Sequence, residues 1–304
     1  MRVLAIDLGK TGCRGSLRVD GHEIGVAHGL GAPGLAFAGG LAAAEQAVRA
    51  VIDETAPTGF VLFVGAAGAA AAPDVAAELA RRLADSASAV AVTSDAVIAH
   101  AGALGGAPGV VLAIGTGAVA TAVDRRGRFI RTDGWGPVLG DEGSGGWIGA
   151  EGLRAALRSF DGRGPRSALE AAAADCYGVA VDAVPGLLGR DTNPARLAAR
   201  FAPIVADHAR ADTVAGGIVN AAAGALARTV SATIERSGLP AQVPFAITGG
   251  LAGLGRPLLD PLETAVASLV DRRDPLGDAI EGAHLLATNS DTVLETSVVR
   301  VGNY

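Results

Sequence analysis

The first eighteen residues, MRVLAIDLGKTGCRGSLR, constrain the fold most strongly. A short apolar strand runs into Asp-x-Gly-x-Thr and then directly into a second strand, which predicts a β-hairpin whose turn can hold a phosphate. Gly9 and Gly12 allow positive φ angles and close approach of the backbone to an anion, and Thr11 adds a hydroxyl donor. Asp7 places a carboxylate where a hydrated Mg²⁺ can bind. Taken alone, the segment fits an ordinary hairpin equally well.

Two other nucleotide-binding motifs fit this segment less well. A dinucleotide fingerprint needs G-x-G-x-x-G at the start of a helix. Here the glycines are Gly9, Gly12 and Gly15, and the residues that follow alternate like strand, turn and strand. A P-loop needs G-x-x-x-x-G-K-[ST], and the sequence contains no such run. The hairpin interpretation is therefore preferred.

The first glycine turn (residues 9–12) also contains Lys10, the single lysine among the 25 basic residues of the chain. One explanation is a biased base composition that left one lysine by chance. The other is that a compact ammonium group suits a phosphate at this position better than a branched guanidinium.

Composition narrows the classes of function. The chain has 304 residues, half of them hydrophobic, which is enough for two α/β lobes with their own cores. A net charge of −6 without a basic run argues against binding to nucleic acid or to an anionic membrane. The N-terminus does not resemble a signal peptide, and no run reaches about 18 uninterrupted apolar residues. We therefore expect a soluble, cytoplasmic protein, and we expect a homodimer.

The cysteines and histidines predict no metal cluster. Cys13 and Cys176 are far apart and lack the C-x-x-C spacing of a zinc or iron-sulfur site. The five histidines are scattered along the chain, so we interpret them as structural residues and expect no catalytic triad.

Apolar runs predict two successive series of strands and helices. In the first series, strands are expected at residues 3–6, 16–19, 24–27, 60–64 and 89–92, with helices at 40–54 and 73–84. The second series has strands at 110–114, 118–123, 129–131 and 243–248, and helices at 146–160, 167–177, 194–209, 212–237 and about 275–287. Each series opens with a strand, a glycine turn and a hairpin, which indicates an internal duplication. Pro108-Gly109 separates an N-terminal lobe, 1–107, from a C-terminal lobe, 108–304.

The second glycine turn (residues 115–117) repeats the first at the matching point of the second series. It consists of Gly115, Thr116 and Gly117 after an apolar strand. Gly-Thr-Gly is a weak signal alone, because such turns are common in hairpins. Two such turns facing each other across a cleft would hold a triphosphate from both sides.

A third glycine turn (residues 247–251) reads Ile-Thr-Gly-Gly-Leu, where a buried strand stops and a helix is expected to begin. Gly249 and Gly250 would let a flat base or ribose lie against the backbone, and the helix N-terminus would offer unpaired amides. A plain strand-to-helix turn remains the alternative.

Asp95 follows the predicted strand 89–92, in the run Val-Thr-Ser-Asp. As an isolated residue it would be interpreted as a helix cap, and Ser94 could play the same part. The alternative is chemical, because a carboxylate at a strand end can orient and deprotonate an alcohol that attacks phosphorus.

The densest polar glycine run is the glycine-rich segment (residues 134–149), GWGPVLGDEGSGGWIG. A surface linker would not normally carry two tryptophans, and a core strand would not carry adjacent carboxylates. A ligand-lining loop explains both, because carboxylates and backbone groups suit sugar hydroxyls and an indole offers an apolar wall. The candidate sugar-binding residues are Gly134, Trp135, Gly136, Asp141 and Glu142.

The order of these motifs resembles the BadF/BadG/BcrA/BcrD-type ATPase family, and within it the N-acetylglucosamine kinases of the sugar kinase, Hsp70 and actin superfamily. The resemblance covers essentially the whole chain, and its most specific part is GWG-x-x-x-GDEGS-x-x-x-IG. The matching stretches are, in order, DLGKT, TSDA, AIGTGA, GWGPVLGDEGSGGWIG, ITGG and PLGDAIEGAHLLA.

The resemblance implies an α/β fold of two ribonuclease-H-like (actin-like ATPase) lobes, with ATP and sugar in a central cleft. It implies that Thr11 and Thr116 contact ATP phosphates, that Asp7 helps to hold Mg²⁺, and that Asp95 is the catalytic base. Sugar contacts would fall on Asp95 and on the glycine-rich segment, through Gly134, Trp135, Gly136 and Asp141. The candidate ATP-binding residues are Gly9, Lys10, Thr11, Gly115, Thr116, Gly117, Gly249 and Gly250.

The sequence departs from the N-acetylglucosamine kinase pattern at the sugar side. Where those kinases carry Ser-Asn after Gly-Thr-Gly, this chain has Ala118 and Val119. The asparagine that follows their third strand is missing from the run HGLGAPGLAF here. Another branch of the family activates dehydratases and holds an iron-sulfur cluster through cysteines, which two isolated cysteines do not support.

These observations predict an ATP-dependent kinase that phosphorylates the 6-hydroxyl of N-acetylglucosamine, with Asp95 accepting the hydroxyl proton. A rival within enzymes is a kinase of glucosamine, glucose or another hexose. A rival of another class is a nucleotide-dependent sugar sensor that uses the same residues without turnover. A panel of sugars in an assay of ADP release distinguishes the three.

Overall fold

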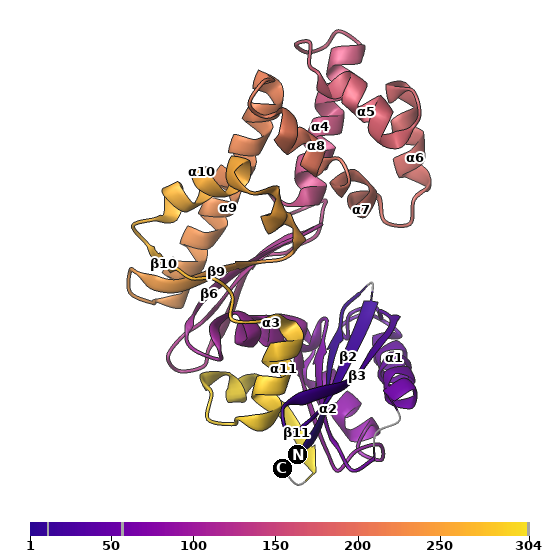
Figure 1. Cartoon of the computed structure of the whole chain (residues 1–304), viewed down its shortest axis with the longest axis vertical. Coiled ribbons are helices and arrows are strands. Elements are labelled where there is room, and N and C mark those ends of the chain that lie inside the picture. Colours follow the sequence, from indigo (N-terminus) through magenta and orange to yellow (C-terminus); the bar gives the residue numbers. More distant parts are fainter. Residues whose placement is uncertain (11, 56–57, 303–304) are drawn as a thin grey trace. The chain divides into compact units, whose positions relative to one another are not determined.

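The computed structural model describes residues 1–10, 12–55 and 58–302. Contacts within the chain divide it into two compact units, each built on one β-sheet (Figure 1). Unit 1 consists of Met1–Gly109, Ala122–Phe129 and Arg273–Tyr304, and unit 2 of Val110–Thr121 and Ile130–Arg272.

The sheet of unit 1 has the strand order β11-β5-β4-β1-β2-β3. Strands β1, β2 and β3 pair antiparallel, β4 and β5 continue the sheet parallel to β1, and β11 closes the other edge antiparallel to β5. The strands are β1 (Arg2–Leu8), β2 (Gly12–Val19), β3 (His22–Leu30), β4 (Val61–Ala66), β5 (Ala89–Ser94) and β11 (Val299–Gly302).

Helices cover both faces of this sheet, because alternate strand residues point to opposite sides. Leu4 and Ile6 of β1 pack with α1 and α2, whereas Val3 and Ala5 pack with α3 and α11. The helices are α1 (Gly40–Thr55), α2 (Pro73–Arg82), α3 (Asp95–Leu104) and α11 (Ala279–Thr288), with short 3₁₀ helices η1 (Ala69–Ala71) and η4 (Val293–Ser297).

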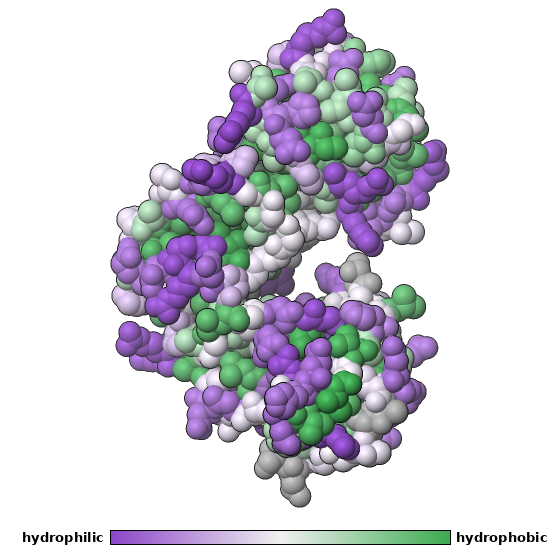
Figure 2. Space-filling view, viewed as in Figure 1, coloured by the Kyte–Doolittle hydropathy of each residue, from purple (hydrophilic) through white to green (hydrophobic). Residues whose placement is uncertain are grey.

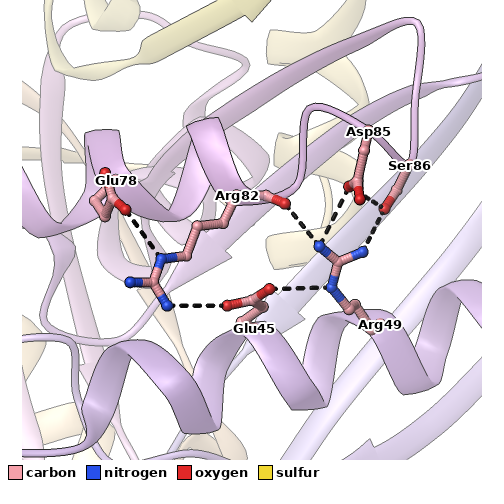
Figure 3. A network of polar contacts seen from close by, with 6 residues as sticks. All are labelled: Glu45, Arg49, Glu78, Arg82, Asp85 and Ser86. Atoms are coloured by element: carbon pink, nitrogen blue, oxygen red, sulfur yellow. Dashed lines mark hydrogen bonds and ion pairs between the residues drawn. The ribbon is translucent and has the colours of Figure 1, made fainter.

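A polar network ties α1 to α2 and the turn after it (Figure 3). The Arg49 guanidinium donates to the Ser86 hydroxyl at 2.9 Å and to the Arg82 carbonyl at 2.7 Å. Glu45 on α1 accepts from both Arg49 and Arg82. Half-exposed ion pairs of this kind typically contribute up to about 1 kcal/mol each. The network therefore fixes the outer face of unit 1 more than it stabilises the fold.

The sheet of unit 2 has the order β10-β9-β6-β7-β8. Strand β9 lies parallel to β6, and β10 lies parallel to β9. The strands are β6 (Gly109–Ile114), β7 (Ala118–Val123), β8 (Phe129–Asp133), β9 (Val243–Thr248) and β10 (Val270–Arg272). The helices α4 and α9 lead from this sheet into a helical region made of α5 to α8 (Figure 1).

The helices of unit 2 vary widely in length. The longest, α9, is capped by Asp212, whose carboxylate accepts from the Val214 and Ala215 amides. The helices are α4 (Gly145–Phe160), α5 (Leu169–Tyr177), α6 (Val184–Arg190), α7 (Pro194–Ala199), α8 (Ala202–His208), α9 (Thr213–Ser237) and α10 (Arg256–Val266), with 3₁₀ helices η2 (Val181–Ala183) and η3 (Gly250–Leu254).

The two sheets share one strand order. In each unit the first three strands are neighbours, and the next two strands extend the sheet on the other side of the first strand. Strands β4 and β5 of unit 1 thus correspond to β9 and β10 of unit 2, with the same parallel pairing. This common topology supports the internal duplication expected from the sequence.

The division of the chain differs from two consecutive lobes. Residues 273–304, expected in the C-terminal lobe, pack with unit 1. The reason is local packing, since β11 pairs with β5 and α11 packs closely on α3. A Cβ added at Gly282 would lie 1.9 Å from the Ile98 carbonyl oxygen, so glycine is required at this helix contact. The residues after the last expected helix, 275–287, therefore contain the edge strand of unit 1.

Two expected helices also differ. The helix expected at 194–209 is two helices, α7 and α8, because Pro203 lacks an amide hydrogen and starts a new helix after the buried Phe201. After β9 the chain forms the five-residue η3, and α10 begins only after Gly255. The helix α6 and the strands β10 and β11 were not expected from the sequence.

Hydrophilic and apolar residues alternate over the visible face of each unit in Figure 2. Among the described residues, no single helix combines the length and apolar content needed to cross a membrane, and only the bent pair Leu169–Tyr177 with Val181–Arg190 meets that test jointly.

Candidate functional site

The first glycine turn joins β1 to β2 and is fixed by backbone contacts. The Gly9 amide donates to the Gly12 carbonyl at 2.9 Å, and the Ala32 amide donates to the Gly9 carbonyl at 3.1 Å. A Cβ added at Gly31 would lie 2.5 Å from the Gly12 nitrogen, so the segment after β3 can pack on the turn only with glycine there. Thr11 lies outside the described residues. Sequence reasoning did not identify Gly31. The available signal was its position shortly after the predicted third strand, which pairs with the strand that follows the turn.

Lys10 projects from this turn. Its ammonium nitrogen lies 5.9 Å from the centroid of the Phe37 ring, a cation–π distance. Both side chains are exposed. The lysine is therefore on the surface of unit 1, available to an anion at the turn.

Asp95 lies close enough to Asp7 for its charge to raise the pKa of Asp7. Asp7 is near the end of β1, and Asp95 follows β5 in the same sheet. The pKa of Asp7 is raised from 3.8 to about 6, chiefly by burial and then by the negative charge of Asp95, against the opposing effect of Arg14. A carboxylate pair with a raised pKa is a common property of sites that bind cations or transfer protons.

The N-cap of α3 is Ser94 rather than Asp95. Ser94 is the N-cap residue of α3, and its hydroxyl oxygen accepts from the Val97 amide at 3.2 Å. The Asp95 carboxylate accepts from the Ala96 amide at 2.9 Å. Ser94 is therefore the N-cap of α3, and the Asp95 carboxylate adds one hydrogen bond within the first turn.

Arg14 and Asp278 complete the charged cluster of unit 1. Arg14 is the direct cross-strand partner of Asp7 in the β1–β2 hairpin, and its guanidinium forms an ion pair with Asp278. Asp278 also caps α11, accepting from the Ile280 amide at 2.9 Å. Sequence reasoning missed both residues. The hairpin register, symmetrical about the turn, was the available signal for Arg14.

The second glycine turn is bound to the start of α4. The Gly115 amide donates to the Gly117 carbonyl at 2.8 Å, which closes the turn. The Gly145 amide donates to the Gly115 carbonyl at 2.8 Å, and the Gly146 amide to the Thr116 carbonyl at 2.9 Å. The first amides of α4, which have no partner inside the helix, thus hold the turn.

Asp141 links this turn to the glycine-rich segment. Its carboxylate accepts hydrogen bonds from the backbone amides of Gly136 and Ala118. Burial raises the pKa of Asp141, and those two hydrogen bonds oppose the shift. A Cβ added at Gly117 would lie 2.8 Å from Asp141 Oδ2, so the carboxylate lies directly against the turn. Asp141 therefore has a scaffolding part in addition to any contact with a sugar.

Arg131 organises the opposite end of the same segment. Its guanidinium donates to the carbonyls of Asp133 and Gly134 and lies 5.0 Å from the Trp135 ring centroid. The Trp135 side chain is 69 % exposed, and Glu142 is also exposed. The indole is therefore presented on the surface of unit 2 rather than packed into its core. Sequence reasoning did not identify Arg131, which lies three residues before the segment.

The third glycine turn packs on the second. Gly249 has φ +93°, and a Cβ added to it would lie 2.4 Å from the Ile114 carbonyl oxygen, one residue before Gly115. Gly250 begins η3 and has open space around its Cα. Unit 2 therefore brings together the second turn, the third turn and Asp141, while unit 1 brings together Asp7 and Asp95.

A metal site built only from side chains is not present in the part of the chain that the structure describes. No group of three or more His, Cys, Asp or Glu residues there could hold an ion. Asp7 is a half-buried carboxylate with Asp95 as its near neighbour. That suits Mg²⁺, which usually takes one or two protein carboxylates together with waters and substrate phosphates.

The chain matches solved structures of one fold. It superposes on a provisionally named N-acetylglucosamine kinase from Chromobacterium violaceum with a TM-score of 0.72 and 28 % identity, over 95 % of this chain and 99 % of that one. This match confirms the expected class, an α/β protein with the fold of actin-like ATPase sugar kinases. The sequence matches the BadF/BadG/BcrA/BcrD ATPase family over residues 4–287, and the chain belongs to that family.

Two curated relatives match parts of the chain. An N-acetyl-D-glucosamine kinase from Dictyostelium discoideum is 30 % identical over 208 residues, 66 % of this chain and 65 % of the relative. An N-acetylmuramic acid/N-acetylglucosamine kinase from Clostridium acetobutylicum is 43 % identical over 81 residues, 27 % of this chain and 26 % of the relative. The matched regions thus span less than two thirds of either relative.

Proposed function

We propose that this protein is an ATP-dependent kinase that phosphorylates the 6-hydroxyl of an amino sugar, with N-acetylglucosamine as the first substrate. The observation that carries the proposal is the carboxylate pair of Asp7 and Asp95, with the pKa of Asp7 raised to about 6. Membership of an ATPase family and similarity to proteins named as N-acetylglucosamine kinases support it.

In the proposed reaction, Asp95 accepts the proton of the sugar hydroxyl while the hydroxyl oxygen forms a bond to the γ-phosphorus of ATP. The bond from that phosphorus to the bridging oxygen breaks, and ADP leaves. Ser94 caps α3 in place of Asp95, which supports a role for this carboxylate other than capping. Phosphoryl transfer asks for little covalent chemistry from a protein, so positioning supplies most of the rate.

Asp7 would hold Mg²⁺. Its carboxylate is buried beside a second carboxylate, which disfavours its ionised form, and a divalent cation would relieve that cost. The bound ion would neutralise charge on the phosphates. Lys10, at the exposed edge of the same turn, would add a positive charge on the phosphate side.

The backbone of the two glycine turns, with Thr11 and Thr116, would contact the phosphates, and Gly249 and Gly250 would border the nucleoside. Sugar hydroxyls would be bound by Asp141 and by backbone groups of Gly134 and Gly136, with Trp135 against the ring or acyl group. The exposed indole and the cation–π contact from Arg131 support this part, because an aromatic face on a protein surface suits an apolar sugar face. Glu142, which is exposed, is the remaining candidate.

A sugar panel tests the proposal. Release of ADP is measured with N-acetylglucosamine, N-acetylmannosamine, N-acetylmuramic acid, glucosamine and glucose, and NMR of the product locates the phosphate. N-acetylmuramic acid belongs in the panel because one relative is named for it. Highest efficiency with glucosamine or glucose would favour the rival hexose kinase. Binding of nucleotide and sugar without turnover of any sugar would favour a sensor.

The proposal includes a homodimer that acts in the cytoplasm on small molecules, without a nucleic-acid or membrane partner. The net charge of −6 supports the absence of a polyanionic partner. Light scattering coupled to size-exclusion chromatography measures the mass, and a monomer at micromolar concentration would remove the dimer from the proposal.

A further inference from the structure

Unit 2 contains a cavity of about 500 Å³ beside the glycine-rich segment. One wall is the loop part of that segment, from Pro137 to Asp141, and another is the start of α4. The third wall is the connection between α6 and α7, with Leu188, Thr192 and Asn193. Ligand cavities commonly measure about 300–1,000 Å³ and combine apolar walls with a few polar groups. This cavity has that size and that mixture.

One face of α4 lines the cavity. Trp147, Ala150 and Arg154 are spaced by three and four residues, which places them on the same side of a helix. On a neighbouring face, α4 touches α7, because a Cβ added at Gly149 of α4 would lie 1.9 Å from the carbonyl oxygen of Ala198 in α7. The cavity is therefore a gap left beside a tight helix contact, where the small Ala150 follows the large Trp147.

The two ends of the cavity differ in charge. At the loop end lies Asp141, whose carboxylate is already engaged by two backbone amides. At the other end lies Arg154, whose guanidinium donates to Glu151 at 2.7 Å. Glu151 is not part of the cavity wall. Among the described residues Arg154 has no second acceptor, and most of its five N–H donors remain available.

We propose that this cavity receives an acidic substituent of the amino sugar, with its carboxylate on Arg154. The inference rests on the proposed function, because Asp141 borders both the cavity and the candidate sugar contacts. Seven residues separate Trp147 from Arg154, about 10 Å along the helix axis, and a helical side chain leans toward the N-terminus. Arg154 thus lines the cavity about two helical turns along α4 from Trp147, and the proposal requires that a substituent of the sugar, rather than the ring itself, extends to it. Arginine is also the side chain best shaped to bind a carboxylate.

The test uses N-acetylglucosamine that carries a carboxymethyl ether on O1, O3 or O4, and the matching neutral 2-hydroxyethyl ethers. At least one acidic derivative should be phosphorylated with kcat/KM tenfold or more above its neutral counterpart. Arg154→Gln should reduce that ratio at least tenfold, and Arg154→Lys less. Arg163→Gln is the matched control, because Arg163 is an exposed, ion-paired arginine outside the cavity wall. It should keep the wild-type ratio.

A second readout avoids turnover. In the Trp135→Phe variant, Trp147 is the remaining tryptophan, and its fluorescence should change on titration with the preferred acidic derivative without ATP. Two outcomes would overturn the inference and leave the proposed function intact. One is phosphorylation of N-acetylglucosamine without preference for any acidic derivative, and the other is an unchanged ratio of acidic to neutral kcat/KM in Arg154→Gln. Absence of turnover with every sugar would overturn the proposed function and the inference with it.

Discussion

The first and second glycine turns occupy the same place in their units but are held in different ways. The first is fixed by the segment after β3, where Gly31 and Ala32 contact it, and it lies next to the half-buried carboxylates of Asp7 and Asp95. The second is held by the first amides of α4 and by the carboxylate of Asp141. One duplicated hairpin thus provides charge in unit 1 and a backbone scaffold in unit 2.

If the carboxylates of unit 1 perform the chemistry, the largest effect should come from Asp95→Asn. We expect kcat to fall by about 10²–10⁴, the usual range for loss of a general base, while nucleotide affinity is retained. Steady-state kinetics and a nucleotide titration measure the two quantities. Asp53→Asn, at an exposed position on α1, is the control and should be neutral. Retention of more than half of the wild-type turnover would remove Asp95 from the chemistry.

Asp7 should make the ligand-free protein less stable as pH rises. Its folded pKa is raised to about 6, whereas the unfolded value is 3.8, so the folded state holds the proton at higher pH. The stability from this proton is present below about pH 4 and is lost as pH rises through about 6. The loss at pH 7.5 is on the order of 3 kcal/mol.

Asp7→Asn should be inactive, because it removes the proposed Mg²⁺ ligand. The variant should nevertheless be more stable than wild type at pH 7.5, with little difference in stability at pH 4. Urea unfolding at both pH values measures this, with Asp53→Asn as the control. A variant that is less stable than wild type at pH 7.5 would show that the carboxylate forms contacts that outweigh its burial.

In unit 2 the corresponding change is Asp141→Ala. It removes the acceptor of the Ala118 and Gly136 amides next to the second glycine turn, and it also removes a proposed sugar contact. The value of kcat/KM should therefore fall both for ATP and for the sugar. Loss of a charged hydrogen bond typically costs about 1.5–3 kcal/mol, or about 10- to 150-fold. Initial rates with each substrate varied separately measure it. Asp260→Ala, an exposed carboxylate on α10, is the control. A loss limited to the sugar would contradict the scaffolding role.

Substitutions within the two turns should have smaller effects. Thr116→Val and Lys10→Ala should each weaken ATP use about twofold to tenfold, because single hydrogen bonds and exposed charges contribute about 0.5–1.5 kcal/mol. The Michaelis constant for the sugar should change less. Unchanged ATP kinetics in both variants would indicate that the turns are structural hairpins only.

The smallest effect concerns selectivity. Val119 packs against Gly134, since a Cβ added there would lie 3.0 Å from Val119 Cγ2. Replacing Ala118 and Val119 by Ser and Asn would offer polar partners at this point, and we expect the range of hexosamines that are phosphorylated to become narrower. Efficiencies over the sugar panel measure it. A wild-type protein that already rejects all sugars but one by about 10⁴-fold would show that other residues supply selectivity.

The sequence predicted those parts of the molecule that local patterns determine. The apolar runs located the inner strands of both sheets, and Asp95 and the glycine turns were expected at strand ends, where they lie. Contacts between distant residues were not predictable in this way. Arg14 and Asp278 are 264 residues apart, and neither lies in a pattern that signals the other. Gly31 was missed because its need for a small side chain arises only when β3 pairs with β2.

The edge of unit 1 carries a consequence for synthesis of the chain. Strand β5 is covered by β11, which emerges about 200 residues later. At a translation rate of roughly 5–20 residues per second, the β5 edge stays unpaired for about 10–40 seconds. During that time it presents free backbone groups of the kind that recruit strands from other chains. Nascent chains that are close together on one messenger RNA would thus be most prone to aggregate through this edge.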